Sequence, residues 1–110
     1  MTPGAQLQAL ADPTRRAIFD LVLEAPSSVR GLSDRVPVSQ PAVSQHLRVL
    51  RDASLVRSAT VGARHIYTPD PHGIATLRAW IDGMWDDVMD AFVDAAHKDA
   101  STQERRPAQT

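Results

Sequence analysis

The strongest pattern of apolar and polar positions in the chain lies between residues 39 and 52. Val43, Leu47 and Leu50 recur at intervals of three and four residues, which is the spacing of one helix face. Ser39 can cap the start of this helix, and Pro41 falls in its first turn, where a missing N–H costs nothing. The sequence therefore predicts a helix with one buried side and one polar side.

The segment before this helix predicts further, shorter helices. Asp12 followed by Pro13 is a strong start signal, with the aspartate as cap and the proline at the first helical position. The helix after it is expected to run to about residue 23 and to bury three apolar side chains, Ile18, Leu21 and Val22. A short helix is expected over residues 6–11, and residues 1–4 are expected to be disordered.

A break at residues 25–28 separates these helices from the next one. Ser28 is placed to cap a short helix over residues 29–35, and Val36-Pro37-Val38 is a tight connection to the helix at 39–52. Two helices joined in this way, the second with polar outer residues, form the helix-turn-helix pattern.

After residue 54 the apolar period changes from helical to about two. Residues 55–60 and 64–68 therefore read as strands, and Val61-Gly62-Ala63 supplies a hairpin turn that contains glycine. Arg57 and Arg64 flank this turn. A hairpin that follows a helix-turn-helix is a wing, so the predicted fold is mainly α with a small β-hairpin, a winged helix-turn-helix.

A long helical pattern runs from His72 to about His97. Its apolar stripe is too broad for one small monomer core to cover, and such patches usually mark contacts between proteins. We therefore expect a homodimer, although packing within the monomer stays an alternative. The expected interface residues are Leu77, Ile81, Met84, Trp85, Val88 and Phe92. Residues 5–97 would form a single DNA-binding and dimerisation domain, and residues 98–110 a polar tail.

The polar side of the helix at 39–52 carries short or planar hydrogen-bonding side chains, the types that pair with base edges and phosphates in a major groove. An ordinary solvated face would carry more acids and lysines. With the two hairpin arginines, the expected DNA-binding residues are Ser39, Gln40, Ser44, Gln45, His46, Arg48, Arg57 and Arg64. Arg15 and Arg16 either contact phosphates or are simply solvated.

The charge of the chain is divided between two regions. Although the net charge is −1, residues 27–66 hold six arginines and two aspartates, whereas residues 70–100 hold seven aspartates, one arginine and one lysine. The first region can approach a polyanion and the second stays away from it. The chain has no cysteine, which excludes disulfides and thiolate sites, and no apolar run could span a membrane. Cytoplasm is the expected location, since no secretory signal is visible.

Three segments together resemble the ArsR/SmtB family of winged-helix repressors: LADPTRRAI at 10–18, VSQPAVSQHL at 38–47 and GARHIY at 62–67. The resemblance implies a homodimer that represses transcription from a double-stranded DNA operator until a signal releases it. It also implies that the helix at 39–52 enters the major groove, that the hairpin arginine reaches a neighbouring groove or its phosphates, and that the terminal helices dimerise.

The chain departs from the metal sensors of that family. Residues 29–35 hold no thiol where those sensors carry their cysteine motif, and the aspartates of the last helix repeat as on a solvated face. We therefore expect no metal and no cofactor, and the chain resembles the non-metal branch of the family. No catalytic constellation is visible, so an enzyme is not expected. A winged-helix module for protein–protein contact and a sensor with a non-cysteine metal site remain the alternatives.

Overall fold

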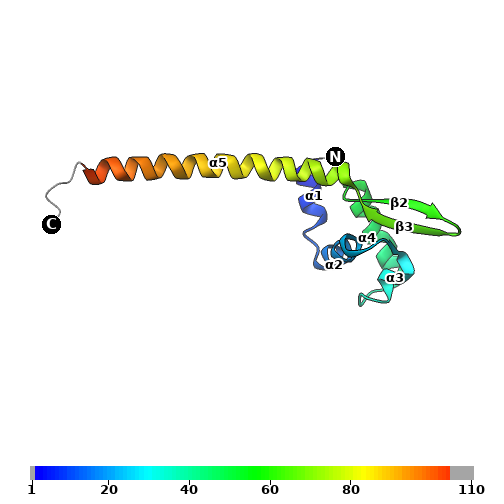
Figure 1. The fold of residues 1–110 in the computed structure, drawn as a ribbon. Coiled ribbons are helices and arrows are strands. Elements are labelled where there is room, and N and C mark those ends of the chain that lie inside the picture. The colour runs from blue at the N-terminus through cyan, green and yellow to red at the C-terminus, as the bar shows by residue number, and fades with distance from the viewer. Residues whose placement is uncertain (1, 105–110) are drawn as a thin grey trace. The chain divides into compact units, whose positions relative to one another are not determined.

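The computed structural model describes residues 2–104, and the fold is mainly helical with one small sheet. The backbone forms two compact units, one up to Arg78 and one from Ala79. The elements follow in the order α1 (Pro3–Ala9), α2 (Pro13–Glu24), β1 (Ser27–Ser28), α3 (Val29–Ser33), α4 (Gln40–Asp52), β2 (Val56–Val61), β3 (Arg64–Pro69) and α5 (Pro71–Glu104) (Figure 1). The predicted winged helix-turn-helix is confirmed, with α3 and α4 as its two helices and β2–β3 as the wing.

Side-chain caps fix where the helices begin. The Asp12 carboxylate accepts the backbone N–H of Arg15 at 2.9 Å, and the Ser28 hydroxyl accepts that of Gly31 at 3.0 Å. Ser39 caps α4 in the same way, through the N–H of Ala42 at 3.4 Å. These three caps are the predicted ones, because a short polar side chain before a helix satisfies an N–H that has no partner inside the helix.

Two chain ends differ from the expectation. The N-terminal helix begins at Pro3, with Thr2 as its cap, so the expected disorder of residues 2–4 is corrected. Helix α5 continues to Glu104, beyond the expected end near His97. The apolar stripe stops before that point, but alanine, lysine, glutamine and glutamate sustain a helix without it. Residues 1 and 105–110, which fall in the expected disordered terminus and polar tail, lie outside the described residues.

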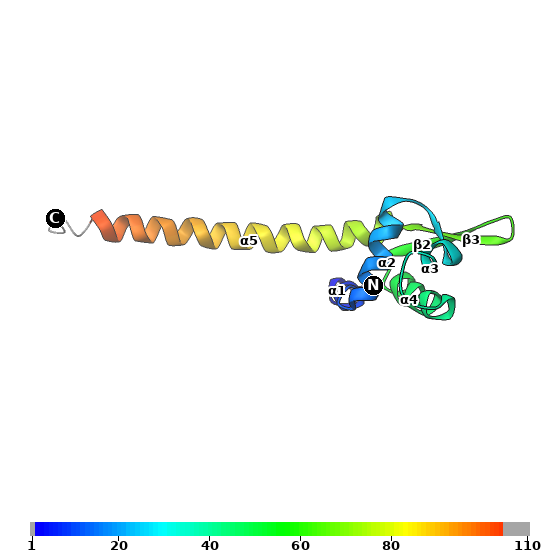
Figure 2. The same ribbon diagram turned by 90° about the horizontal axis from the view of Figure 1, so that it is seen from below.

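The sheet has three antiparallel strands in the order β1-β3-β2, one more than the expected hairpin. Ser27 and Ser28, expected to be a break, pair with Tyr67 and Ile66 of β3. A strand of two residues leaves no alternation to detect in the sequence. The predicted hairpin is present (Figure 2), although its strands cover residues 56–61 and 64–69, so Val61 belongs to β2 and not to the turn. Gly62 begins the turn with a φ of 64°, a conformation that favours glycine.

The core of the first unit is built from four elements around α4: α1, α2, α3 and β2. Val43, Leu47 and Leu50 are completely buried, as their spacing predicts, and pack with apolar residues of α2, α3 and β2. Of the three α2 residues expected inside, Ile18 and Val22 are buried and Leu21 is half-buried against the core. The fold thereby fixes which side of α4 remains outside.

The start of α5 packs tightly against the turn that ends α4. Ser54 takes the left-handed conformation at φ 58°, and the N–H groups of Ser54 and Leu55 return to the carbonyls of Arg51 and Leu50. A Cβ at Gly73 would lie 1.5 Å from the Ser54 carbonyl oxygen, so only glycine allows this approach. The buried Gln6 side chain of α1 donates to the Gly73 carbonyl at 2.7 Å. Helices α1, α4 and α5 therefore meet at one junction.

Candidate nucleic-acid interface

The outward side of α4 carries the polar residues that the sequence singles out. Gln40, Ser44 and Arg48 follow one another at intervals of four, so they lie in one row along the helix, with Gln45 beside them. All four are exposed, as is the cap residue Ser39, whereas the opposite side of the helix is completely buried. The helix is thus held by its apolar side and presents hydrogen-bonding groups to the outside.

His46 differs from its neighbours on α4. It is half-buried and lies near the start of α2, where its charge acts on Asp12. The hydrogen bond from the Arg15 N–H is the largest influence that lowers the pKa of Asp12, and His46 adds to it. The side chain of His46 therefore faces another element of the protein as well as the polar face.

The two arginines of the wing are both exposed, but they lie at opposite ends of the hairpin. Arg64 is the first residue after the turn and pairs with Val61, so it sits near the tip. Arg57 pairs with Thr68 at the other end of the hairpin, next to the buried Val56. The expectation that both flank the turn holds for Arg64 alone. The two positive charges are spread along the wing.

A further exposed arginine, Arg30, was not among the expected DNA-binding residues but lies beside Gln40 of α4 and Arg64 of the wing. Arg30 of α3 lines a hollow of about 320 Å³ together with five residues from β1, α3, α4 and β3: Ser28, Val29, Gln40, Arg64 and His65. The excess of arginine over residues 27–66 is the signal that could have indicated it. Sequence spacing alone could not show which arginines share a surface.

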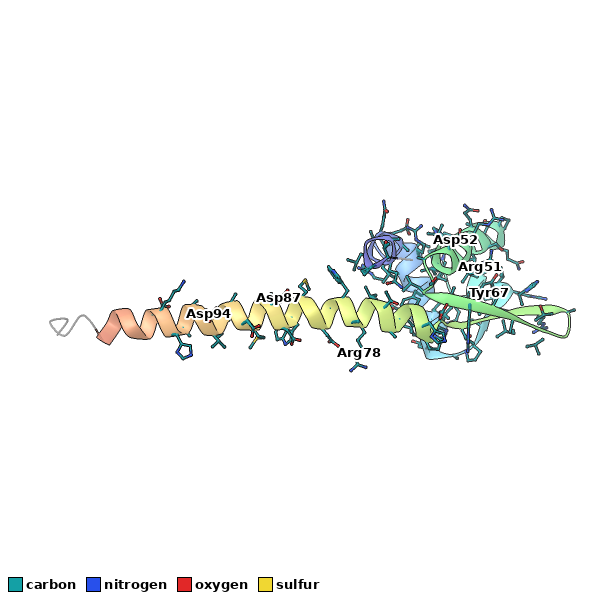
Figure 3. The ribbon with its side chains drawn as sticks, turned by 90° about the horizontal axis from the view of Figure 1, so that it is seen from above. Arg51, Asp52, Tyr67, Arg78, Asp87 and Asp94 are labelled. Carbon is teal, nitrogen blue, oxygen red and sulfur yellow. The ribbon has the colours of Figure 1, made fainter. Side chains whose placement is uncertain are left out.

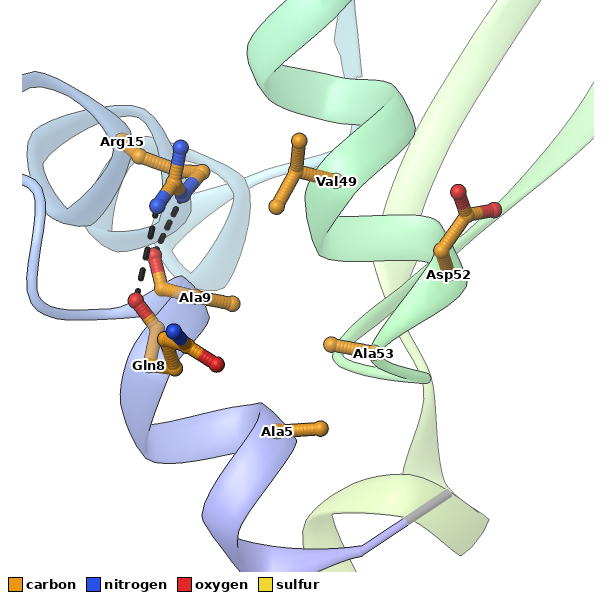
Figure 4. Close-up of a pocket in the computed structure, with 7 residues that line it drawn as sticks. All are labelled: Ala5, Gln8, Ala9, Arg15, Val49, Asp52 and Ala53. Atoms are coloured by element: carbon orange, nitrogen blue, oxygen red, sulfur yellow. Dashed lines mark hydrogen bonds between the residues drawn. The ribbon is translucent and has the colours of Figure 1, made fainter.

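Arg15 is used inside the protein. Its guanidinium donates to the backbone carbonyls of Ala9 and Gln8, at the end of α1 (Figure 4). It thereby adds donors for the last carbonyls of the helix, of which Gln8 also accepts the Ala11 N–H, and carries a positive charge to the negative end of the helix dipole. This contact within the protein differs from both roles that the sequence suggested for Arg15, a phosphate contact and a solvated side chain.

The expected dimer residues fall into two groups. Leu77 is half-buried and packs against the core of its own winged helix. The other five, Ile81, Met84, Trp85, Val88 and Phe92, are exposed, and so are Trp80, Met89 and Val93, with exposed fractions between 40% and 66%. Figure 3 labels Asp87 and Asp94, two of the aspartates on the same helix.

Two further features of the described residues are the grouping of metal-ligating side chains and the apolar length of the helices. Among residues 2–99, no three histidine, aspartate or glutamate side chains gather into a group that could hold a metal ion. No helix in the described ranges has the length and apolar character needed to cross a bilayer.

Comparison with known proteins identifies the family. The model of the bacterial regulatory proteins of the arsR family matches residues 12–58. The chain is 48% identical over 84 residues to the HTH-type transcriptional regulator Rv2034 of Mycobacterium tuberculosis, covering 76% of this chain and 78% of that protein. It is 39% identical over 74 residues to the HTH-type transcriptional repressor SmtB of the same organism, covering 67% of this chain and 55% of that protein.

A solved structure agrees with these matches. An ArsR-like transcriptional regulator from Rhodococcus sp. RHA1 superposes with a TM-score of 0.68 at 31% identity, covering 86% of this chain and 92% of that one. The superposition thus extends well beyond the segment that the family model matches. With α4 and the wing arranged as described, the chain belongs to the ArsR family of bacterial transcriptional regulators, and its winged helix-turn-helix is the DNA-binding domain.

Proposed function

We propose that this regulator is a homodimeric repressor that binds an inverted-repeat operator in double-stranded DNA. The observation that carries the proposal is the two-sided construction of α4. Its inner side is locked in the core by Val43, Leu47 and Leu50, and its outer side exposes Gln40, Ser44, Gln45 and Arg48. A helix held in this way can present its polar side chains to a major groove at a fixed angle.

The outer residues divide into base readers and phosphate contacts. Gln40 and Gln45 have planar amides that can make paired hydrogen bonds to adenine, and the Ser44 hydroxyl can donate or accept. Arg48, Arg57 and Arg64 supply positive charge for backbone phosphates, which sets the strength of binding on any sequence. Ser39 and His46 lie at the edges of this surface, where contact with a phosphate is their expected role.

The exposed apolar stripe of α5 supports the homodimer. Met84, Trp85, Val88 and Phe92 all face solvent in the single chain, and a second copy of the same stripe would cover them. Two-fold symmetry of the protein then requires two-fold symmetry of the operator, with half-sites about one helical turn, or a multiple of it, apart.

Repression requires only that the bound dimer exclude the transcription machinery from the operator. The proposal therefore uses no catalytic group, metal or cofactor. It places the protein in the cytoplasm, where the operators of a bacterial chromosome lie. The names of its relatives, which include a repressor, agree with this role.

Selection of duplexes from a random DNA library tests the proposal. We expect the selected sites to share a dyad-symmetric sequence, and a promoter that carries such a site to be silenced when the protein is added. Selected duplexes without dyad symmetry would overturn the dimeric mode of binding. Affinity that is insensitive to salt would indicate a protein–protein module instead, since phosphate contacts release counterions.

Two substitutions separate base reading from phosphate contact. Gln45→Ala should relax the base preference and cost about 1–3 kcal/mol on the selected site, because a bidentate contact is lost. Arg64→Ala should weaken binding to selected and random DNA alike and reduce the salt dependence by roughly one phosphate. If Gln45→Ala lowered the affinity for selected and random DNA equally, Gln45 would not contact bases.

A further inference from the structure

We propose that the hollow between α3, α4 and the wing is a seat for one phosphate of the DNA backbone, held by Arg30 and Arg64. Its lining comes from Ser28, Val29, Arg30, Gln40, Arg64 and His65. The inference rests on the proposed DNA-binding function and adds to it a residue, Arg30, and a defined place on the DNA. The ligand is a single phosphodiester group.

The pairing of β1 with β3 builds this seat. Because Ser28 lies opposite Ile66, the first residues of α3 come beside the first residues of β3, where Arg64 and His65 lie. Gln40, the first residue of α4, completes the lining from a third direction. The Ser28 hydroxyl accepts the Gly31 N–H at 3.0 Å and keeps its own O–H, so Ser28 and the two arginines can donate to an oxyanion, while Gln40 borders the hollow from α4.

The charge of the lining favours an anion. It contains two arginines and a histidine, and none of its six residues is acidic. Within the described part of the chain, the Arg30 and Arg64 guanidinium groups take part in no hydrogen bond or ion pair, whereas Arg35 pairs with Glu24 at 3.5 Å. Two arginines lining one hollow repel each other, and a phosphate between them would relieve that repulsion through paired N–H···O bonds.

The position of the hollow fits a particular backbone strand. In the proposed complex α4 lies in a major groove and the wing reaches toward the neighbouring groove. Adjacent grooves are separated by one phosphate strand, which must pass between the two elements. The hollow is lined by residues of both α4 and β3, so in the proposed complex it would lie beside this strand. A contact there would fix the register of the helix without reading sequence.

Substitution of Arg30 in the full chain, paired with changes in the DNA, tests the seat. We would measure the affinity of Arg30→Ala for the selected operator and for random duplex over a range of salt. Arg35→Ala is the matched control, because it removes the same charge from a neighbouring exposed arginine that pairs with Glu24. Arg30→Lys keeps the charge, and circular dichroism checks that each variant is folded.

We expect Arg30→Ala to lower the affinity for the operator and for random duplex by about tenfold per half-site, which corresponds to the loss of a charged hydrogen bond. The slope of log affinity against log salt should fall by about 0.9 per half-site. Arg30→Lys should restore the slope, and Arg35→Ala should change it by less than half as much. If Arg30→Ala and Arg35→Ala have equal effects, the seat is wrong, because Arg30 then contributes only general charge.

A duplex series with one neutral methylphosphonate at a time locates the phosphate. We expect one position per half-site at which the neutral group weakens the wild-type protein about tenfold but has no further effect on Arg30→Ala. Equal effects on both proteins at every position would overturn the seat. If Gln45→Ala still relaxes base preference in that case, the proposed function stands and only the seat fails.

Competition with inorganic phosphate tests whether the hollow binds a phosphate of the DNA backbone or a free anion. At constant ionic strength, replacing chloride by phosphate should weaken operator binding by the wild type more than by Arg30→Ala, because free phosphate competes with the DNA backbone for the hollow. A phosphate-specific loss that occurs in the wild type and disappears in Arg30→Ala, without a coupled methylphosphonate position, would assign the hollow to a free anion and overturn the proposal.

Discussion

The winged helix and the part of α5 after Arg78 contain similar kinds of apolar residues, but these are buried in the first region and exposed in the second. In the first unit, Ile18, Leu32, Leu47 and Leu55 are each at most 1% exposed. In the second, every described side chain from Ala79 to Asp99 is exposed, including Trp85 and Phe92. A core needs elements that approach one another from several directions, and a single helix cannot cover its own apolar side.

The two regions also differ in charge. Residues 27–66 are basic and residues 70–100 are acidic, although both lie in a chain of net charge −1. A basic surface attracts DNA and an acidic one is repelled by it. One region thus has a buried core and a basic surface suited to DNA, while the other exposes an apolar stripe beside acidic residues.

The largest expected effect comes from a charge placed on that stripe. Val88→Glu would bury a carboxylate in each half of the proposed interface, at roughly 3–5 kcal/mol for each unpaired charge. The dimer should dissociate at micromolar concentration in sedimentation experiments, and operator binding should fall with it. His97→Glu adds the same charge on the far side of the helix and should leave the dimer intact. A Val88→Glu protein that remains a folded dimer would show that the stripe is not the interface.

A cavity in the first unit should have a different consequence. Leu47→Ala removes a completely buried side chain from α4 and should lower the free energy of unfolding by about 2–5 kcal/mol. Urea unfolding followed by circular dichroism measures this loss. Val88→Ala, at an exposed position, should cost far less in the same experiment at a protein concentration where the chain is monomeric. Equal losses would contradict the separation between a self-sufficient core and an exposed helix.

Two glycines of α5 should respond in opposite directions. At Gly73 an added Cβ would meet the Ser54 carbonyl, so Gly73→Ala should destabilise the protein by about 1–3 kcal/mol through overpacking. At Gly83 an added Cβ meets nothing within 4 Å, so Gly83→Ala should stabilise the helix by about 0.5–1 kcal/mol. Thermal unfolding at fixed protein concentration compares the two. If both substitutions stabilised the protein, the backbone at Gly73 and Ser54 could move apart at little cost, contrary to the tight contact in the structure.

The smallest expected effect is a pH dependence at the start of α2. The pKa of Asp12 lies below its usual value of 3.8, chiefly because the Arg15 N–H donates to the carboxylate. The stability from this cap is therefore full above pH 3.8 and is lost as pH falls through the lowered value. Asp12→Asn keeps an acceptor and should remove this part of the acid sensitivity in urea midpoints measured across pH. An unchanged pH profile would mean that the ionised carboxylate contributes nothing.

The residues that define single elements were predictable from sequence. The caps at Asp12, Ser28 and Ser39, the inner face of α4 and the turn at Gly62 follow from local chemistry, and the structure confirms them. The outward position of Gln40, Ser44, Gln45 and Arg48 follows from the same periodicity, because the apolar residues of a helix fix its other side. Their roles on DNA remain predictions.

The features missed from the sequence all depend on contacts between distant segments. Ser27 and Ser28 become a strand only because β3 offers an edge, and Arg30 joins Arg64 only through that pairing. Leu77 shares the spacing of the exposed stripe, yet packs on its own core because the junction at Gly73 holds the start of α5 there.

The sequence by itself therefore determined which sides of each element are apolar, where helices start, and how charge is divided along the chain. The tertiary structure decided which apolar sides cover one another within the monomer and which charged side chains share a surface. The physical reason is that periodicity and capping act over a few residues, whereas burial and charge clustering depend on which distant segments meet.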